Sequence, residues 1–546
     1  MRRLVSAFNL ILVLMSMLGI TGELQVTYAS PYTNVDVNTA YYMITNGSFP
    51  DLVALDVRTK SEYDSGHIYD AVWIPVDELE TRIEELAGLV DHEIIVYCRS
   101  GGRSATASGI LDSYNFTKVY NMLGGISAWE LIDYPTWIAT VHNLDTTINY
   151  DTIQAAIDAP QTMDGHTIFV EEGIYYEHVV VSKALSLIGE NRSTTIIDGN
   201  KTSIVVFVSA HSVTVEEFTV QNGTTGIYVD HSNDSIVMKN DVIGNVDAVS
   251  ISVSNNCTIR QNFAANNAHR GILITNSWNF TVSNNYVYGN GWYGINANAS
   301  VNGIIVQNNV YENYYDGIGL LDSNNCTIAG NNISGNTIFG VWLDSSHDNF
   351  IYHNNFLNNN FQATTNTLTD HWDNGLEGNY WNNYAGTDYD KDGIGDDAYT
   401  SNEVEDNFPL MGMFHSYNAS LGYDVNVISS STIEDFEYFE SNSTIRMNVS
   451  NMTASQTYGF CRVCIPKGLM SPPYSVIIND GLTEVFHFKD TIHDDETHRC
   501  IYFAYEHSIH KIDIIPEFPS LIITPLFMLA TLIVIIMYRR NHKGRS

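Results

Sequence analysis

Apolar residues recur through the middle of the chain with a period of 22 or 23 residues. Between residues 203 and 359 every repeat carries short apolar stretches at the same positions, so that Ile272, Ile295 and Ile318 share one column. Such a period is typical of leucine-rich repeats or of β-solenoids. The repeats lack a leucine framework and have no stretch long enough for a helix. The pattern therefore predicts a right-handed parallel β-helix in which each repeat forms one coil.

Asparagine fills two further columns of this repeat. The columns are Asn240, Asn262, Asn285, Asn308, Asn331 and Asn354, and Asn222, Asn245, Asn267, Asn290, Asn313, Asn336 and Asn359. Coils of a parallel β-helix stack about 4.8 Å apart, so each amide can reach the equivalent amide of the next coil. Asparagine also tolerates the left-handed backbone of a turn. We expect both columns to be turns whose side chains form hydrogen-bonded ladders.

The region before the repeat has a different pattern. Apolar runs at 52–57, 71–74 and 93–97 predict strands. Residues 77–89 and 102–114 have apolar residues three or four positions apart and predict helices. This alternation is typical of an α/β domain with a mainly parallel sheet, which we assign to residues 30–140.

After the repeat, apolar and polar residues alternate over residues 411–515. Strands are expected at 423–428, 443–449, 474–478 and 500–505, which together predict a small β-sandwich-like domain. This domain contains Cys461, Cys464 and Cys500. A disulfide from Cys500 to one of the other two is the favoured prediction, and a zinc or redox role for the Cys-x-x-Cys pair is the alternative.

The two ends of the chain predict its compartment. Residues 1–29 have two arginines, an apolar run and a small-residue cleavage pattern, as in a signal peptide. Residues 521–538 carry no charge and precede a basic tail at 539–546. We therefore expect a membrane anchor at 516–538, a single transmembrane helix, and a cytoplasmic tail. The bulk of the chain would lie outside the cell membrane, and about fifteen Asn-x-Ser/Thr sequons agree with this.

The formal net charge of the 546-residue chain is −37. Because a polyanion repels DNA and RNA, this charge excludes nucleic acid as a partner of the extracellular part.

The clearest candidate for chemistry is the run Cys98, Arg99, Ser100, Gly101, Gly102, Arg103 and Ser104. It follows a predicted strand and begins a predicted helix, so the thiol would lie where backbone N–H groups converge. That position favours the thiolate, and the glycines allow the backbone to curl round an anion. We predict that Cys98 is the nucleophile and that the six residues after it bind the substrate.

With its preceding landmarks, this loop resembles the single-domain rhodanese family. The landmarks are Asp56-Val57-Arg58, Glu62-Tyr63, Gly66-His67-Ile68 and Ile74-Pro75, in this order before Cys98. The resemblance implies a sulfurtransferase that takes sulfur from a small donor as a persulfide and passes it to a thiophilic acceptor. The four residues between Cys98 and Arg103 match the loop length of sulfurtransferases rather than that of the related phosphatases. The resemblance to this family also implies structural roles for Asp56 and Arg58, and it implies that no cofactor is required.

Segments at both ends of the repeat resemble the NosD-like family of β-helix proteins. They lie at 153–157, 173–177, 197–199, 378–381, 388–396 and 407–410. The resemblance implies a β-helix with a closing segment over 141–410. Some family members act on polysaccharides and one assists the maturation of a copper enzyme. Cys257 and Cys326 lie three coils apart, about 14 Å by coil spacing, so they cannot share a metal ion.

Residues 388–396 hold Asp388, Asp390, Asp392 and Asp396 at the alternating spacing of a calcium loop, with glycine at the sixth position. The twelfth position is Tyr399 instead of the usual glutamate. Two interpretations stay open, a weak Ca²⁺ site and an Asp-rich turn.

Three functions remain open at this stage. The first is a surface sulfurtransferase whose β-helix binds a polysaccharide or a surface protein. The second is a glycan-binding or glycan-cleaving β-helix, for which Asp322 with Asp344 is the best carboxylate pair, one position out of line. Its exposed aromatic candidates are Trp292, Tyr293, Tyr314, Tyr315 and Trp342. The third is a structural or adhesive protein with an inactive rhodanese unit. Residues 515–520 resemble a junction found in archaeal membrane-anchored surface proteins.

Overall fold

The computed structural model describes residues 32–517, except residues 47, 69–70, 137–139, 421, 454 and 507. The chain divides into two compact units, one ending at Ala139 and one beginning at Thr140. The predicted signal peptide, the membrane anchor beyond residue 517 and the basic tail lie outside the described residues. Within those residues, no helix is long and apolar enough to cross a membrane.

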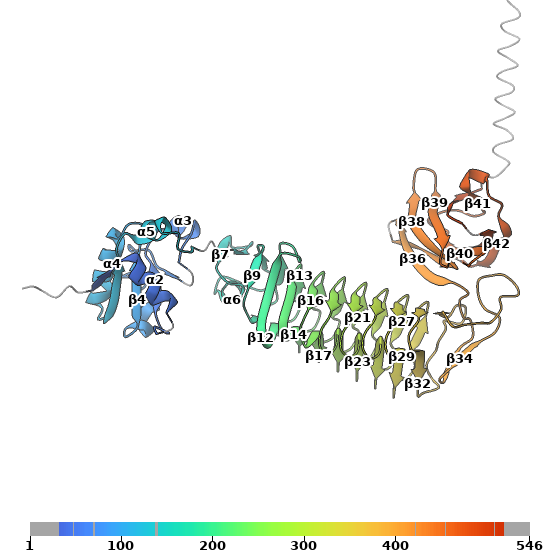
Figure 1. Cartoon of the computed structure of the whole chain (residues 1–546), viewed down its shortest axis with the longest axis horizontal. Coiled ribbons are helices and arrows are strands. Elements are labelled where there is room, and N and C mark those ends of the chain that lie inside the picture. The colour runs from blue at the N-terminus through green and yellow to red at the C-terminus, as the bar shows by residue number, and fades with distance from the viewer. Residues whose placement is uncertain are drawn as a thin grey trace, which may run out of the picture. The chain divides into compact units, whose positions relative to one another are not determined.

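In the described part of the first unit, five parallel strands form a sheet in the order β1-β5-β4-β2-β3 (Figure 1). The strands are β1 (Thr33–Val35), β2 (Val53–Asp56), β3 (Val72–Trp73), β4 (Glu93–Tyr97) and β5 (Lys118–Met122). The helices are α2 (Val37–Thr45), α3 (Lys60–Asp64), the 3₁₀ helix η1 (Ile83–Leu89), α4 (Gly102–Ser113) and α5 (Gly125–Leu131). The predicted α/β domain is confirmed.

The central position of β4 in the sheet explains why its sequence is apolar after Glu93. Ile95 packs into a core with α2 and α5, whereas Ile94 and Val96 pack into a second core with η1 and α4. A parallel strand covered on both faces needs apolar residues at every position. The prediction of a helix over 77–89 is wrong in its first half. Consecutive hydrogen-bonded turns occupy residues 77–82, and only η1 is helical.

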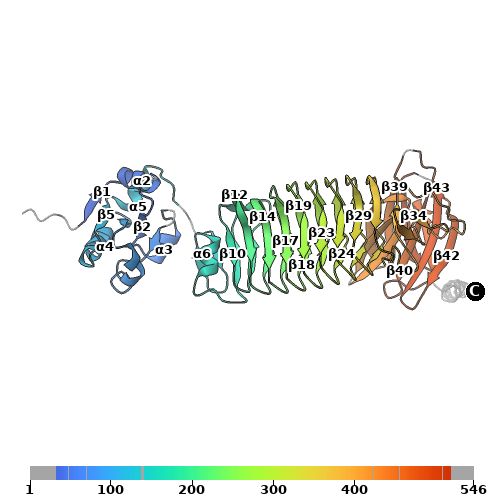
Figure 2. The ribbon, with the colours of Figure 1, turned by 90° about the horizontal axis from the view of Figure 1, so that it is seen from below.

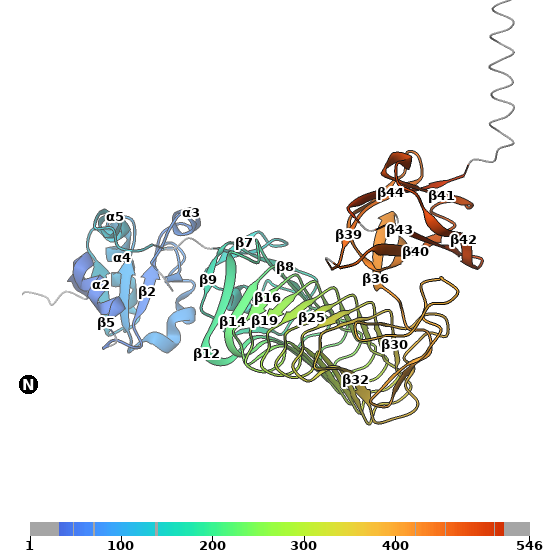
Figure 3. The same cartoon turned by 45° about the vertical axis from the view of Figure 1, so that its right-hand side comes forward.

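The second unit contains a parallel β-helix, as predicted. Its coils are stacked side by side (Figures 2 and 3), and equivalent strands of neighbouring coils pair in parallel and in register. A typical coil has three short strands, such as β23 (Ile295–Asn298), β24 (Ile304–Val306) and β25 (Asn309–Tyr311).

The strands of the β-helix form two sheets. The first holds β24 with β6 (Val141–Asn143), β7 (Ile148–Tyr150), β8 (Thr167–Val170), β11 (Ser186–Gly189), β13 (Thr214–Glu216), β15 (Ile236–Met238), β18 (Thr258–Arg260), β21 (Thr281–Ser283), β27 (Thr327–Ala329) and β30 (Phe350–Tyr352). The second holds β23 and β25 with β9 (Gly173–Tyr175), β10 (Val179–Val181), β12 (Thr195–Val208), β14 (Thr219–Asp230), β16 (Asp241–Ile243), β17 (Asp247–Ser252), β19 (Phe263–Ala265), β20 (Ile272–Thr275), β22 (Tyr286–Tyr288), β26 (Ile318–Leu321), β28 (Asn332–Ser334), β29 (Phe339–Asp344), β31 (Asn355–Leu357), β32 (Phe361–Thr365) and β33 (Tyr380–Trp381).

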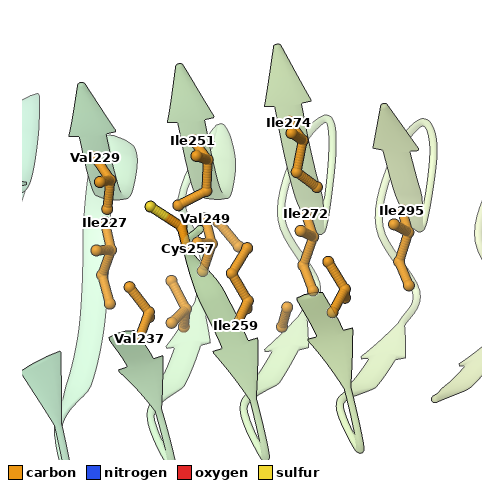
Figure 4. Close-up of a cluster of buried hydrophobic side chains, with 14 of the residues drawn as sticks. Ile227, Val229, Val237, Val249, Ile251, Cys257, Ile259, Ile272, Ile274 and Ile295 are labelled. Carbon is orange, nitrogen blue, oxygen red and sulfur yellow. The ribbon is translucent and has the colours of Figure 1, made fainter. Parts of the chain in front are cut away.

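The core of the β-helix is a stack of the apolar columns seen in the sequence. Ile227, Val249, Ile272 and Ile295 follow one another from coil to coil, and each is fully buried (Figure 4). Inward-facing positions recur once per coil, so a 22- or 23-residue period places β-branched residues on top of one another. Such residues suit a pleated surface.

Both asparagine columns form ladders, with two corrections. Asn308 donates to Asn331 Oδ1 at 2.9 Å, and its neighbours repeat this contact. Asn222 is outside its column, because the pairing of β14 with β16 places Gly223 opposite Asn245. The ladder residues are also not the left-handed ones. Each follows a left-handed residue, as Asn308 follows Gln307 (φ 56°).

A third ladder went unrecognised in the sequence. The backbone N–H of each serine in this column donates to the hydroxyl of the serine one coil further on. The column is Ser232, Ser254, Ser277, Ser300, Ser323 and Ser346.

Each end of the β-helix core is closed by a segment that resembles the NosD-like family. Helix α6 (Ile153–Asp158) buries Ile153, Ala156 and Ile157 against the first coils. At the other end the ring of Trp381 stacks between those of Phe356 and Tyr399, with ring centroids 4.2 Å apart on each side. Such capping keeps the terminal coil of a solenoid from exposing its core.

The described residues from 413 onward form the predicted β-sandwich, after the hairpin β34 (Tyr399–Ser401) and β35 (Val404–Asp406). Its two antiparallel sheets share one apolar core. One sheet contains β36 (Met413–Ser420), β37 (Tyr423–Ser429), β40 (Tyr458–Pro466), β42 (Phe486–Asp494) and β43 (His498–Glu506). The other contains β38 (Ser431–Phe439), β39 (Thr444–Asn451), β41 (Tyr474–Ile478) and β44 (His510–Pro516).

The sandwich contains the predicted disulfide. Cys464 on β40 lies directly opposite Cys500 on β43, and the two are bonded. Cys461 is a buried free thiol, so the pair Cys461 and Cys464 is not an intact Cys-x-x-Cys site.

Candidate functional site

Cys98 lies between the end of β4 and the start of α4, where the sequence placed it. Gly101 precedes the helix with φ 99°, a left-handed conformation that suits glycine. This turn directs the Gly101 N–H at Cys98 Sγ, 3.2 Å away. The thiol therefore sits at the N-terminus of a twelve-residue helix, where the helix dipole favours a negative charge.

The surroundings of Cys98 favour its thiolate. Burial opposes ionisation, since only 1% of the residue is exposed. The polar groups of Ser104, Ser100 and Gly101 near the thiol outweigh this effect and lower the pKa of the thiol. Among them, the Gly101 N–H is at hydrogen-bond distance from Sγ. A thiolate held by several N–H donors is a ready nucleophile. Gly101 therefore contacts the thiol directly, and substrate binding by Ser100, Gly101 and Ser104 stays a prediction.

The two arginines of the loop differ. Arg103 forms a bidentate ion pair with Glu62, with both N–O distances 2.7 Å. This pairing lowers the pKa of Glu62 to about 2. Arg99 is exposed to solvent. Arg103 thus fastens the start of α4 to α3, while Arg99 is the guanidinium at the solvent side of the loop.

Sequence reasoning assigned no role to three residues that shape this loop. Gly125 (φ 59°) lies against it, because a Cβ there would be 2.3 Å from the Cys98 carbonyl oxygen. Asn121 accepts a 2.7 Å hydrogen bond from Ser104 Oγ, and Glu62 holds Arg103. The adjacent pair Gly124-Gly125 was a visible signal in the sequence, whereas the contacts of Asn121 and Glu62 depend on tertiary packing.

Asp56 and Arg58 have structural surroundings. Both are buried, and Arg58 donates to both carboxylate oxygens of Asp56 and to the Gly66 carbonyl oxygen, 2.7 Å away. Their contacts join the end of β2 to the segment after α3.

A cysteine whose Sγ accepts a backbone N–H between a parallel strand and the N-terminus of a helix is typical of a rhodanese-type site. Residues 39–131 match the model of the rhodanese-like domain, and residues 160–386 match that of the periplasmic copper-binding protein NosD. A sulfurtransferase of Allochromatium vinosum is 37% identical over 79 residues, which are 14% of this chain and 72% of that protein. The chain therefore belongs to the rhodanese-like family and also carries a NosD domain.

Two further similarities concern parts of the chain. A cell surface glycoprotein of Methanothermus fervidus is 34% identical over 104 residues, which are 19% of this chain and 17% of that protein. The crystal structure of a rhodanese-related protein from Thermoplasma volcanium matches with 29% identity and a TM-score of 0.18, covering 20% of this chain and 99% of that one.

The acidic loop brings three of its four predicted ligands together. Among the described residues, Asp388, Asp390 and Asp392 each offer an oxygen atom within 4.8 Å of the others. Burial raises the pKa of Asp388 and Asp392. Asp396 stands apart, with its carboxylate accepting the Tyr389 N–H at 2.6 Å. Tyr399 is in the closing stack of the β-helix core.

The other candidates on the β-helix are only partly assembled. Trp292, Tyr293, Tyr315 and Trp342 pack against one another, with ring centroids 5.1–6.1 Å apart. Tyr314 is 69% exposed. The strand partner of Asp344 is Leu321, so Asp322 is one position out of line, as expected.

The β-helix cysteines also remain separate. Cys257 and Cys326 are free and buried in the core.

Proposed function

We propose that the protein is a sulfurtransferase that carries sulfur as a persulfide on Cys98. The thiolate attacks the outer sulfur of a small donor such as thiosulfate, so that a new S–S bond forms and the donor S–S bond breaks to release sulfite. A thiophilic acceptor such as cyanide then attacks the outer persulfide sulfur. Thiocyanate leaves and the Cys98 thiolate is restored, so the cycle needs no oxidant or cofactor.

The observation that carries this proposal is the position of Cys98 Sγ at the N-terminus of α4, 3.2 Å from the Gly101 N–H, where this N–H and the helix dipole act together. They stabilise the thiolate before attack and after release, and they suit the negative charge of a persulfide between the two steps. Arg99, at the solvent side of the loop, supplies a positive charge for an anionic donor. The similarity to a sulfurtransferase over 79 residues supports the same chemistry.

Thiosulfate:cyanide turnover by the full chain tests the proposal. Cys98→Ser should abolish thiocyanate formation, and mass spectrometry after thiosulfate treatment should find one added sulfur on Cys98 of the unaltered protein. Cys257→Ser is the matched control, because it removes a buried thiol whose pKa is raised by burial, and it should leave turnover unchanged. Equal turnover in Cys98→Ser and the unaltered protein would refute the assignment.

We also propose that the protein works outside the cell membrane, anchored by its C-terminal segment, and that the β-helix serves for binding. The description of NosD as periplasmic and the cell surface glycoprotein among the relatives support this location. Labelling of intact cells with a membrane-impermeant amine reagent should modify the protein, which should then sediment with membranes. Recovery in an unlabelled cytosolic fraction would refute the location.

We propose that Ca²⁺ binds Asp388, Asp390 and Asp392. Three carboxylates within 4.8 Å of one another repel each other unless a cation lies among them, and Gly393 (φ 90°) permits the turn that brings them together. Arg462, which lies 3.3 Å from Asp392, offsets part of this repulsion, so we expect weak binding. Asp396 serves the loop backbone.

A further inference from the structure

An elongated groove follows one corner of the β-helix across several coils. Two cavities of about 750 and 450 Å³ make up the groove. They share Asn284, Gln307 and Asn309 on their walls, so they are continuous. The groove reaches from the coil of Asp241 to strand β36, where the β-sandwich begins.

Amide side chains line the middle of this groove. Gln261, Asn284 and Gln307 occupy one left-handed turn position on successive coils, with φ between 56° and 58°. Within the described part of the chain, none of these three side-chain amides has a hydrogen-bond partner. The ladder residue Asn308, by contrast, uses its whole amide inside the protein. The groove thus presents a row of free donors and acceptors, one per coil.

Aromatic rings lie next to the amides. Phe263 and Tyr286 are strand partners on neighbouring coils and both line the larger cavity. Tyr286 is 51% exposed. A ring beside free amides suits a ligand that has apolar C–H faces and hydroxyl groups on the same unit, as a pyranose does.

The far end of the groove holds an unsatisfied imidazole. His415 on β36 lines the smaller cavity, and its Nε2 is buried without a hydrogen-bond partner among the described residues. Burial lowers the pKa of His415 to about 4, so the ring is neutral near pH 7. The neutral ring therefore adds no charge to this end of the groove.

Charge and strand pairing narrow the choice of ligand. Charged residues at the near end form pairs, Arg192 with Asp241 at 3.5 Å and Lys239 with Glu217 at 3.3 Å. The net charge of −37 disfavours an acidic polymer. A peptide that extends a sheet needs an unpaired strand edge, and strands such as β22 and β25 on the groove floor are paired on both sides.

We propose that this groove binds an extended, neutral polysaccharide, with its sugar rings against Tyr286 and its hydroxyl groups hydrogen-bonded to Gln261, Asn284 and Gln307. The inference deepens the proposed binding role of the β-helix and is independent of the chemistry at Cys98.

Affinity electrophoresis of the full chain tests this inference in gels containing a neutral β-glucan, a mannan or a galactan. We expect at least one of these polymers to retard the unaltered protein. Tyr286→Ala and Gln307→Ala should each weaken that binding at least tenfold. Tyr176→Ala is the matched control, because it removes an exposed tyrosine that lines neither cavity of the groove, and it should bind as the unaltered protein does.

Three outcomes would overturn the inference. They are no retardation by any of the three neutral polymers, equal binding by Tyr286→Ala and Tyr176→Ala, and retention by polygalacturonate or a gelatin digest in their place. Circular dichroism of each variant separates lost binding from lost folding, and Gln307→Ala changes an exposed amide with no internal partner. Thiocyanate formation by the same samples reports on Cys98 separately.

Discussion

Replacing Asn308 by leucine should destabilise the β-helix strongly, because its side chain connects three coils. Its Nδ2 donates to Asn331 Oδ1, Val282 O and Val306 O at 2.9–3.0 Å. Its Oδ1 accepts from the backbone N–H and the Nδ2 of Asn285, both at 3.0 Å. Leucine has a similar size but makes none of these five contacts.

The magnitude follows from these contacts. The two N–H groups and the carbonyl oxygen of the amide make at most four full hydrogen bonds. A net contribution of about 1 kcal/mol per hydrogen bond gives a loss of about 4 kcal/mol in the free energy of unfolding. Much of this loss arises because the Asn285 N–H stays buried without an acceptor. Asn360→Leu is the control, since Asn360 is exposed and its side chain forms no hydrogen bond with other described residues. We expect that change to cost less than about 0.5 kcal/mol.

Two measurements check this prediction. Guanidinium unfolding followed by circular dichroism should give a clearly lower midpoint for Asn308→Leu than for Asn360→Leu. A solenoid can open locally, so hydrogen exchange with mass spectrometry should also be applied to peptides from residues 281–311. The Asn285 amide should exchange about a thousandfold faster in Asn308→Leu, since each 1.36 kcal/mol is tenfold. Equal midpoints together with unchanged exchange would refute the ladder argument.

Three further predictions concern the other regions. Because Arg103 lowers the pKa of Glu62 to about 2, their ion pair stabilises fully above pH 4.5 and is lost as the pH falls from 4.5 towards 2. Glu62→Gln should remove this part of the pH dependence of the melting temperature, and an unchanged profile would contradict it. With a Kd on the order of 10⁻⁴ M, tenfold excess calcium should add about 1.4 kcal/mol, and Asp390→Ala should remove this gain. If calorimetry detects no calcium binding at millimolar concentration, the proposed Ca²⁺ site is wrong and the loop is an Asp-rich turn. Reduction of Cys464–Cys500, which are 36 positions apart, should cost about 4 kcal/mol, and an unshifted urea midpoint would argue against this.

The sequence alone was sufficient for the architecture of the β-helix. Each side chain of a strand points either into the core or into solvent. In a β-helix the same direction recurs at the same position of every repeat. Columns of apolar residues such as Ile272 and Ile295 therefore predict which positions of successive coils stack on each other. The Cys98 loop was equally visible, because a strand, a glycine-rich turn and a helix are contiguous in the chain.

Tertiary structure decided what periodicity leaves open. Glu62 meets Arg103 across 41 positions, and Cys500 bonds Cys464 rather than Cys461 because only Cys464 lies opposite it in the β40–β43 register. Gln307 has the left-handed backbone, whereas Asn308, one residue later, forms the ladder. Which of the two takes which role likewise depends on how they pack against the next coil. Local patterns report which face a residue occupies, whereas its partner is selected by distances between chain segments that only the folded structure brings together.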